Sequence, residues 1–127
     1  MFVESNKALV QRYFDAVLNA QRWGVIDELF GGYPLLADAT RKTVSEYRLA
    51  VPDIRYTLDS LIAEEDRVVA CWTARGTTIL RHKGFPFPLG ALVMSGIHIF
   101  RVTDGQFTGL HPMTRLPRPA PETWGDN

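Results

Sequence analysis

The chain has 127 residues, of which 46% are hydrophobic, and its 14 basic and 14 acidic side chains give a formal net charge of +0. This length supports one domain with one core, and the hydrophobic fraction excludes a disordered chain. The balanced charge argues against nucleic-acid binding, which needs a basic surface. No stretch approaches the roughly 18 apolar residues of a membrane span, and the N-terminus lacks the basic start of a signal peptide. We therefore expect a cytoplasmic protein that does not contact membranes.

The first predicted element is a long amphipathic helix. It is capped by Ser5 or Asn6 and runs to about residue 21. Its apolar residues recur at helical spacing and form one stripe: Val10, Tyr13, Phe14, Val17 and Leu18.

Two shorter helices are expected next. The first covers residues 25–30 and is stopped by Gly31–Pro34, which contains two glycines and a proline. The second begins at Asp38 or Thr40 and ends at about Ala50. Asp38 is a good helix N-cap, which is one explanation for its presence.

After the third helix the hydrophobic period changes to two, which indicates strands. Alternation over residues 54–58 predicts the first strand, and residues 67–79, 91–102 and 106–114 predict three more. Asp104-Gly105 lies between the last two and is a strong signal for a hairpin turn.

This order of elements predicts a single α+β domain. We expect a curved, barrel-like antiparallel sheet wrapped around the N-terminal helices, with a cone-shaped pocket between them. We assign this domain to residues 1–116 and a proline-rich, extended and weakly held tail to residues 117–127.

His98 is a candidate for the pocket, because on its strand it shares one face with Met94, Gly96 and Phe100. An imidazole with a pKa near neutrality can donate a hydrogen bond or act as a base. The alternative is a core histidine with satisfied hydrogen bonds. His111 is expected to point outward, into a subunit contact.

On the second strand, Cys71 is expected inside the sheet with Thr73. Trp72 then points to the opposite face, where it would be covered by another surface. Cys71 is the only cysteine of the chain, and there are only three histidines. These counts argue against a disulfide, a cysteine-built zinc site or a histidine-rich metal cage, and we expect no metal and no cofactor.

Three segments carry a family resemblance: Pro-Asp-Ile-Arg at 52–55, Val-Val-Ala-x-Trp-Thr-Ala-x-Gly-Thr at 68–77, and Gly-Ile-x-Ile-Phe-Arg-Val-x-Asp-Gly at 96–105. With the first helix, they resemble the SnoaL-like polyketide cyclases, which belong with the ketosteroid isomerases to the nuclear transport factor 2-like superfamily. The resemblance covers most of residues 7–116 and implies a homodimer formed through the sheet. This superfold hosts enzymes, binding proteins and interaction modules.

The resemblance also implies catalytic roles. Tyr13 follows Val-Gln-Arg, as does a tyrosine of the ketosteroid isomerases that donates a hydrogen bond to an enolate oxygen. His98 stands where that tyrosine has an acidic partner. Asp38 aligns either with the general base of the family or with a helix cap, and Pro112 stands where many cyclases carry an acid.

Two functions follow. The first is a cofactor-independent acid/base enzyme that acts on a carbonyl carbon acid of a polyketide- or steroid-like molecule, by cyclisation or isomerisation, with Tyr13, Asp38 and His98 as catalytic residues. The alternative is a non-catalytic module that binds a hydrophobic small molecule or only forms a dimer. The residues predicted to bind the ligand are Phe14, Val17, Tyr47, Tyr56, Cys71, Thr73, Met94, Phe100 and Leu110.

Overall fold

The computed structural model describes residues 2–79, 89–115 and 118–119. The helical elements are α1 (Val3–Arg12), the π-helix η1 (Tyr13–Asn19), α2 (Gly24–Leu29) and α3 (Pro34–Ala50). The strands are β1 (Arg55–Glu64), β2 (Arg67–Thr78), β3 (Gly90–Thr103), β4 (Gln106–Thr114) and β5 (Arg118–Pro119). Helices therefore precede strands, as predicted.

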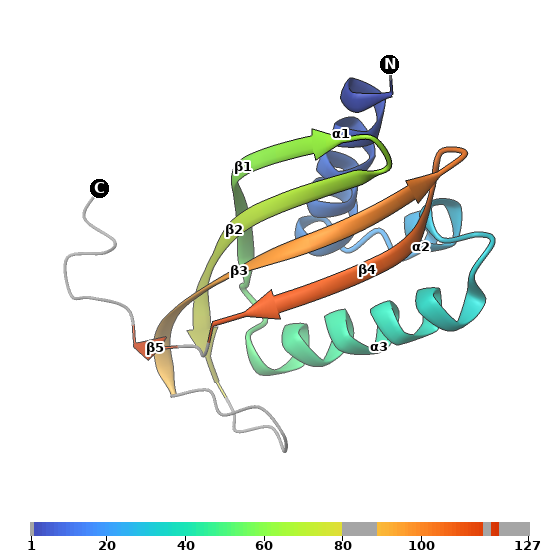
Figure 1. The fold of residues 1–127 in the computed structure, drawn as a ribbon. Coiled ribbons are helices and arrows are strands. Elements are labelled where there is room, and N and C mark those ends of the chain that lie inside the picture. The colour runs from blue at the N-terminus through green and yellow to red at the C-terminus, as the bar shows by residue number, and fades with distance from the viewer. Residues whose placement is uncertain (1, 80–88, 116–117, 120–127) are drawn as a thin grey trace.

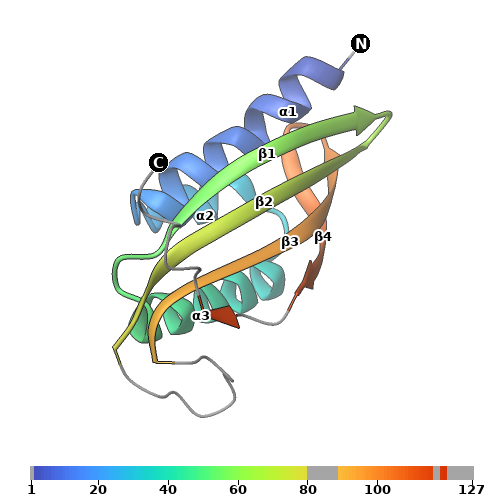
Figure 2. The same cartoon turned by 90° about the vertical axis from the view of Figure 1, so that its left-hand side faces the viewer.

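The strands form one antiparallel sheet in the order β1-β2-β3-β4, with β5 paired to β3. Figures 1 and 2 show a curved sheet with the helices on its concave side, where α1 packs against β1 and β2. The sheet does not close into a barrel, because β1 and β4 are not paired with each other. The predicted α+β class and the curved sheet around the helices are confirmed. None of the helices in the described ranges is both long and apolar enough to cross a membrane.

The first helix begins earlier than predicted and changes its hydrogen-bonding pattern midway. Phe2 occupies the N-cap position, and Ser5 and Asn6 lie inside α1, so the predicted cap is wrong. Asn6 is instead buried and donates a hydrogen bond to the carbonyl of Glu65 in the β1–β2 turn (3.3 Å). From Tyr13 the chain continues as a π-helix, a rare form that occurs often at functional sites.

α3 begins at Pro34, one helical turn before the predicted start. Proline fits the first helical position, because the amide hydrogen that it lacks would have no partner there. The Gly31–Pro34 segment therefore starts a helix as well as ending the previous one. Asp38 consequently lies within α3 and is not its N-cap, so the predicted cap role is wrong.

The predicted turn between the last two strands is confirmed. Asp104 and Gly105 have φ angles of 52° and 75°. Two consecutive residues with positive φ are typical of the tight turns that match the twist of a hairpin. Within the predicted tail, β5 pairs with Leu92 and Val93 of β3. The other residues of the tail lie outside the described residues.

The two faces of β2 are the reverse of the prediction. Trp72 is buried on the concave face and opposes Gly96, whereas Cys71 and Thr73 point to the outer face, away from the helices. The pairing with β3 decides this, because directly opposite residues of antiparallel strands share a face. On the outer face, Thr73 donates a hydrogen bond to Asp59 (2.6 Å).

Candidate functional site

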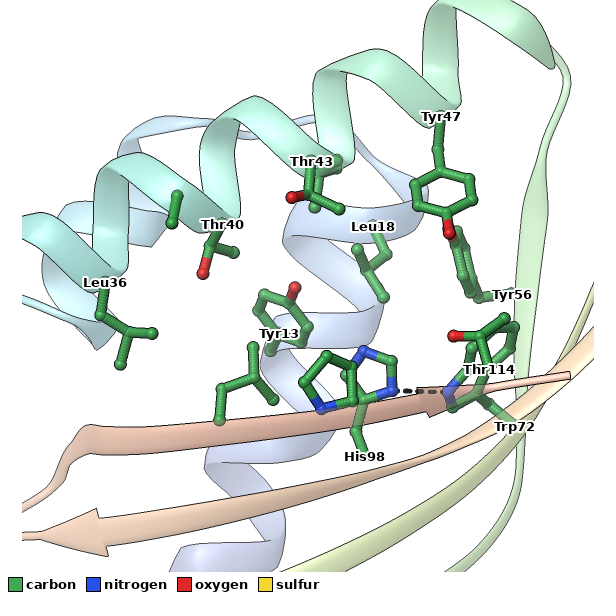
Figure 3. A pocket seen from close by; sticks show the side chains of 14 residues that line it. Tyr13, Leu18, Leu36, Thr40, Thr43, Tyr47, Tyr56, Trp72, His98 and Thr114 are labelled. Carbon is green, nitrogen blue, oxygen red and sulfur yellow. Dashed lines mark hydrogen bonds between the residues drawn. The ribbon is translucent and has the colours of Figure 1, made fainter. Parts of the chain in front are cut away.

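A cavity of about 330 Å³ lies between α3 and the concave face of the sheet, with η1 at its inner end (Figure 3). This volume is at the small end of the range typical of ligand sites. Its described lining comes from two helices and four strands: Tyr13, Leu18, Leu36, Ala39, Thr40, Thr43, Val44, Tyr47, Tyr56, Trp72, His98, Leu110, Pro112 and Thr114. This set contains hydroxyl, imidazole and indole groups but no carboxylate, lysine or arginine.

The π-helix brings Tyr13 and Leu18 to the cavity together. Hydrogen bonds in a π-helix join residues five apart, so side chains at that separation lie on nearly the same side. In the figure both side chains extend from η1 into the cavity (Figure 3). Asn19 then holds the end of η1 to β1, since its side chain exchanges two hydrogen bonds with the backbone of Tyr56 (2.8 and 2.9 Å).

Tyr13 presents its hydroxyl to the cavity. Its ring is held by edge contacts with four phenylalanines at centroid distances of 5.6 to 6.1 Å: Phe14, Phe30, Phe100 and Phe107. The hydroxyl has no hydrogen-bond partner among the described residues and points toward α3 (Figure 3). Burial raises the pKa of Tyr13, so the phenol stays protonated and can donate a hydrogen bond.

His98 reaches the cavity from β3. Its ring contacts Phe14 and Phe100, with centroid distances of 6.1 and 5.9 Å, and Trp72 Nε1 donates a hydrogen bond to His98 Nδ1 at 2.7 Å. Burial lowers the pKa of His98 to about 4, so the imidazole is neutral at neutral pH. The prediction that His98 faces the pocket agrees with this placement.

The remaining hydroxyl groups are spread around the cavity. Thr40, Thr43 and Tyr47 extend from α3, while Tyr56 and Thr114 extend from the sheet (Figure 3). Burial raises the pKa of both tyrosines, which keeps them neutral. The cavity therefore offers several neutral polar groups within an apolar wall, an arrangement suited to a mostly apolar ligand with a few oxygen atoms.

The structure brings five of the predicted site residues to the cavity and leaves the others elsewhere. Those at the cavity are Tyr13, Tyr47, Tyr56, His98 and Leu110. Buried in the core behind it are Phe14, Val17, Met94 and Phe100. Those on the outer face of the sheet are Cys71 and Thr73.

Asp38 does not reach the cavity. It lies on the outer side of α3, where its side chain is 73% exposed and accepts a hydrogen bond from Arg41 (3.1 Å). Asp38 is not among the described residues that line the cavity, so its carboxylate is not placed to take a proton from a ligand bound there. His111 lies exposed on the outer face, as predicted.

The predicted site did not include Trp72 or the other residues that α3 contributes beside Tyr47. Leu36, Thr40, Thr43 and Val44 follow helical spacing with Tyr47, so they share its face. This signal is present in the sequence, although Leu36 lies before the predicted start of the helix.

The family model for the SnoaL-like domain matches residues 36–110, which is more than half of the chain. The chain belongs to the SnoaL-like family. The matched region includes most of α3, the strands β1 to β3 and the first half of β4. No curated protein matches the chain in sequence.

Solved structures share this fold at low sequence identity. A SnoaL-like polyketide cyclase from Agrobacterium tumefaciens has a TM-score of 0.73 and 14% identity, over 87% of this chain and 91% of the other. TsrD from Streptomyces laurentii has a TM-score of 0.74 and 22% identity, over 87% of each chain. AclR from Streptomyces galilaeus, which is described as a hydroxylase, has a TM-score of 0.72 and 19% identity, over 90% of this chain and 81% of the other. These likenesses establish the SnoaL-like fold and leave the reaction of this chain open.

Proposed function

We propose that this SnoaL-like protein binds a flat, apolar, oxygenated small molecule and promotes chemistry through its enolate, without a cofactor. The observation that carries this proposal is that two donor groups line one apolar cavity: the Tyr13 hydroxyl, which has no hydrogen-bond partner among the described residues, and His98 (Figure 3). Neutral donors placed where negative charge develops stabilise an enolate oxygen, and removing one such donor costs about 10²- to 10³-fold in rate. The low polarity of the cavity increases this effect.

The reaction begins when a C–H bond next to the carbonyl of the ligand breaks. Its electron pair moves into the carbonyl group, which becomes an enolate with negative charge on oxygen, and the proton passes to a water molecule. In an isomerisation a proton then returns at another carbon atom. In an aldol cyclisation the enolate carbon attacks a second carbonyl of the same molecule, and the new alkoxide takes up a proton.

A second candidate function is non-catalytic binding of the same class of ligand. The specific observation that favours it is the cavity lining, whose described residues include no carboxylate to accept the proton. Asp38, which one alignment with the family places at the general base, is exposed and paired with Arg41. A binding protein needs the donors and the apolar wall but needs no proton acceptor.

One pair of measurements separates these candidates. Binding is measured by titrating the protein with planar phenols, which mimic dienols, and following the fluorescence of Trp72 in the cavity wall. Catalysis is measured as deuterium incorporation next to the carbonyl of a cyclic enone in D₂O, followed by NMR. Tyr13→Phe is the test variant. Tyr33→Phe is the matched control, because Tyr33 is 48% exposed and lies outside the cavity lining.

For the enzyme, we expect saturable phenol binding and deuterium exchange that falls by roughly 10²-fold in Tyr13→Phe and is unchanged in Tyr33→Phe. For the binding protein, we expect saturable binding without exchange and a loss of affinity of about 1 kcal/mol in Tyr13→Phe, the scale of one neutral hydrogen bond. Absence of binding would contradict both functions.

A further inference from the structure

The hydrogen bond between Trp72 and His98 determines which chemistry His98 can perform. The two residues lie on neighbouring strands, and Trp72 Nε1 lies 2.7 Å from His98 Nδ1. An indole N–H can only donate, so His98 Nδ1 must be the acceptor. In a neutral imidazole whose Nδ1 accepts, the proton lies on Nε2.

The surroundings of His98 favour the neutral ring. Phe14 and Phe100 contact it with aromatic rings. The other titratable side chains in the described lining of the cavity are tyrosines: Tyr13, Tyr47 and Tyr56. None of them carries a negative charge at neutral pH, because burial raises the pKa of each. A second proton on Nδ1 would also place two donors against each other at the contact with Trp72.

Trp72 is itself held in position. Its indole is 3% exposed and covers Gly96, so that a Cβ atom at residue 96 would lie 2.6 Å from Trp72 Cζ2. On the other side, the ring of Tyr56 packs against it with a centroid distance of 5.3 Å. The indole N–H therefore reaches His98 from a fixed direction, while the second ring nitrogen of His98 points toward the space between the sheet and α3 (Figure 3).

We infer that Trp72 is a positioning residue that holds His98 as the Nε2–H tautomer, so that His98 donates a hydrogen bond into the cavity and does not serve as a base. With the Tyr13 hydroxyl, this gives two donors for one acceptor oxygen, such as a carbonyl or an enolate. The description of the ligand rests on the proposed function, whereas the tautomer is a property of the free protein.

The test is long-range ¹H–¹⁵N correlation NMR at neutral pH on protein with ¹⁵N-labelled histidine. The His98 signals are assigned by their loss in His98→Gln. We expect only the Nε2–H tautomer in the wild type. Trp72→Phe keeps an aromatic ring but removes the N–H group, and we expect the Nδ1–H tautomer to become populated. The matched control Trp23→Phe, which alters a tryptophan outside the cavity lining, should leave the His98 signals unchanged.

A wild-type His98 that carries its proton on Nδ1, or is doubly protonated at neutral pH, would overturn the inference, whether or not Trp72→Phe folds. An unchanged tautomer in folded Trp72→Phe would also overturn it. Phenol binding is measured on the same samples. If His98 is the Nε2–H tautomer and responds to Trp72→Phe as expected, but no phenol binds, the inference is supported and the proposed function is contradicted. Binding with the Nδ1–H tautomer overturns the inference and leaves the proposed function in place.

Discussion

The neutral state of the partly buried His98 makes folding sensitive to pH. Burial lowers the pKa of this residue to about 4 in the folded protein, whereas a histidine in an unfolded chain titrates near pH ~6.5. Between these values the unfolded chain binds a proton that the folded protein excludes. The free energy of unfolding contributed by His98 is therefore fully present above about pH 6.5 and is lost as the pH falls toward 4.

We expect the replacement His98→Gln to remove this pH dependence, which amounts to at most about 3 kcal/mol at ~1.4 kcal/mol per pKa unit. The measurement is the free energy of unfolding in urea at a series of pH values. The difference between variant and wild type is compared at each pH, so that the contribution of the carboxylates, which both proteins share, cancels. His111→Gln is the control, because His111 is exposed. An identical pH slope for wild type and His98→Gln would contradict the prediction.

Gly96 provides a second prediction at the scale of single residues. A methyl group there would lie 2.6 Å from Trp72 Cζ2 and 2.7 Å from the carbonyl oxygen of Met113, so the indole must move. We expect Gly96→Ala to lower the free energy of unfolding by about 1–3 kcal/mol, the usual cost of overpacking. The control Gly24→Ala places its methyl group in open space and should not destabilise the protein. Chemical denaturation measures both, and equal stability of the two variants would show that the space above Gly96 is not tight.

At the scale of elements, Arg48 links three segments that shape the cavity. From α3, its guanidinium donates hydrogen bonds to the carbonyls of Pro52 (3.1 Å), Ile54 (3.0 Å) and Leu18. Leu18 belongs to the π-helix and lines the cavity, and Ile54 immediately precedes β1. This one side chain thus joins α3, η1 and the start of the sheet.

We expect Arg48→Met to destabilise the protein by about 2–3 kcal/mol, because three carbonyls lose a charged donor. Phenol affinity should fall as well, since Leu18 is no longer fixed. Arg41→Met is the matched control on the same helix, and its pairs with Asp27 and Asp38 are exposed, so a loss below about 1 kcal/mol is expected. Urea unfolding compares them, and an Arg48→Met variant as stable as Arg41→Met would argue against the linking role.

The elements also show why their type was more predictable than their bounds. The period-two pattern and the Asp104-Gly105 turn locate strands and hairpin because these signals are local. The start of α3 was missed because Gly31–Pro34 is compatible both with ending one helix and with starting another. The π-helix was missed because its apolar stripe is also that of an ordinary α-helix, and packing against the sheet selects between them.

At the scale of the whole molecule, we propose that two copies associate through the outer face of the sheet. The prediction that Trp72 lies on this face was wrong, because Trp72 is buried on the concave face, but other apolar side chains are exposed on the outer face. Ile97 (38% exposed) and Met113 (48% exposed) are paired across β3 and β4, and Cys71 opposes Ile97 from β2. These three residues form one contiguous apolar patch, and such patches mark interaction surfaces.

We expect the wild type to sediment as a dimer and Ile97→Lys as a monomer, because a dimer would bury the lysine charge without a partner. The control is Leu35→Lys, since Leu35 is 85% exposed on α3, on the helical side of the molecule. Analytical ultracentrifugation distinguishes these outcomes. A monomeric wild type, or a dimeric Ile97→Lys, would rule out this interface.

The sequence by itself determined the order of elements, the α+β class, the hairpin and the inward direction of His98, because periodicity and turn chemistry are properties of neighbouring residues. Only the tertiary structure decided which face of β2 is inside. Alternation shows that successive side chains point to opposite faces, but the pairing of Trp72 with Gly96 shows which set faces the helices. The same holds for Asp38, whose place on the exposed side of α3 depends on how that helix is oriented over the sheet. The contact between Trp72 and His98 joins residues 26 positions apart, so it exists only once β2 and β3 are paired.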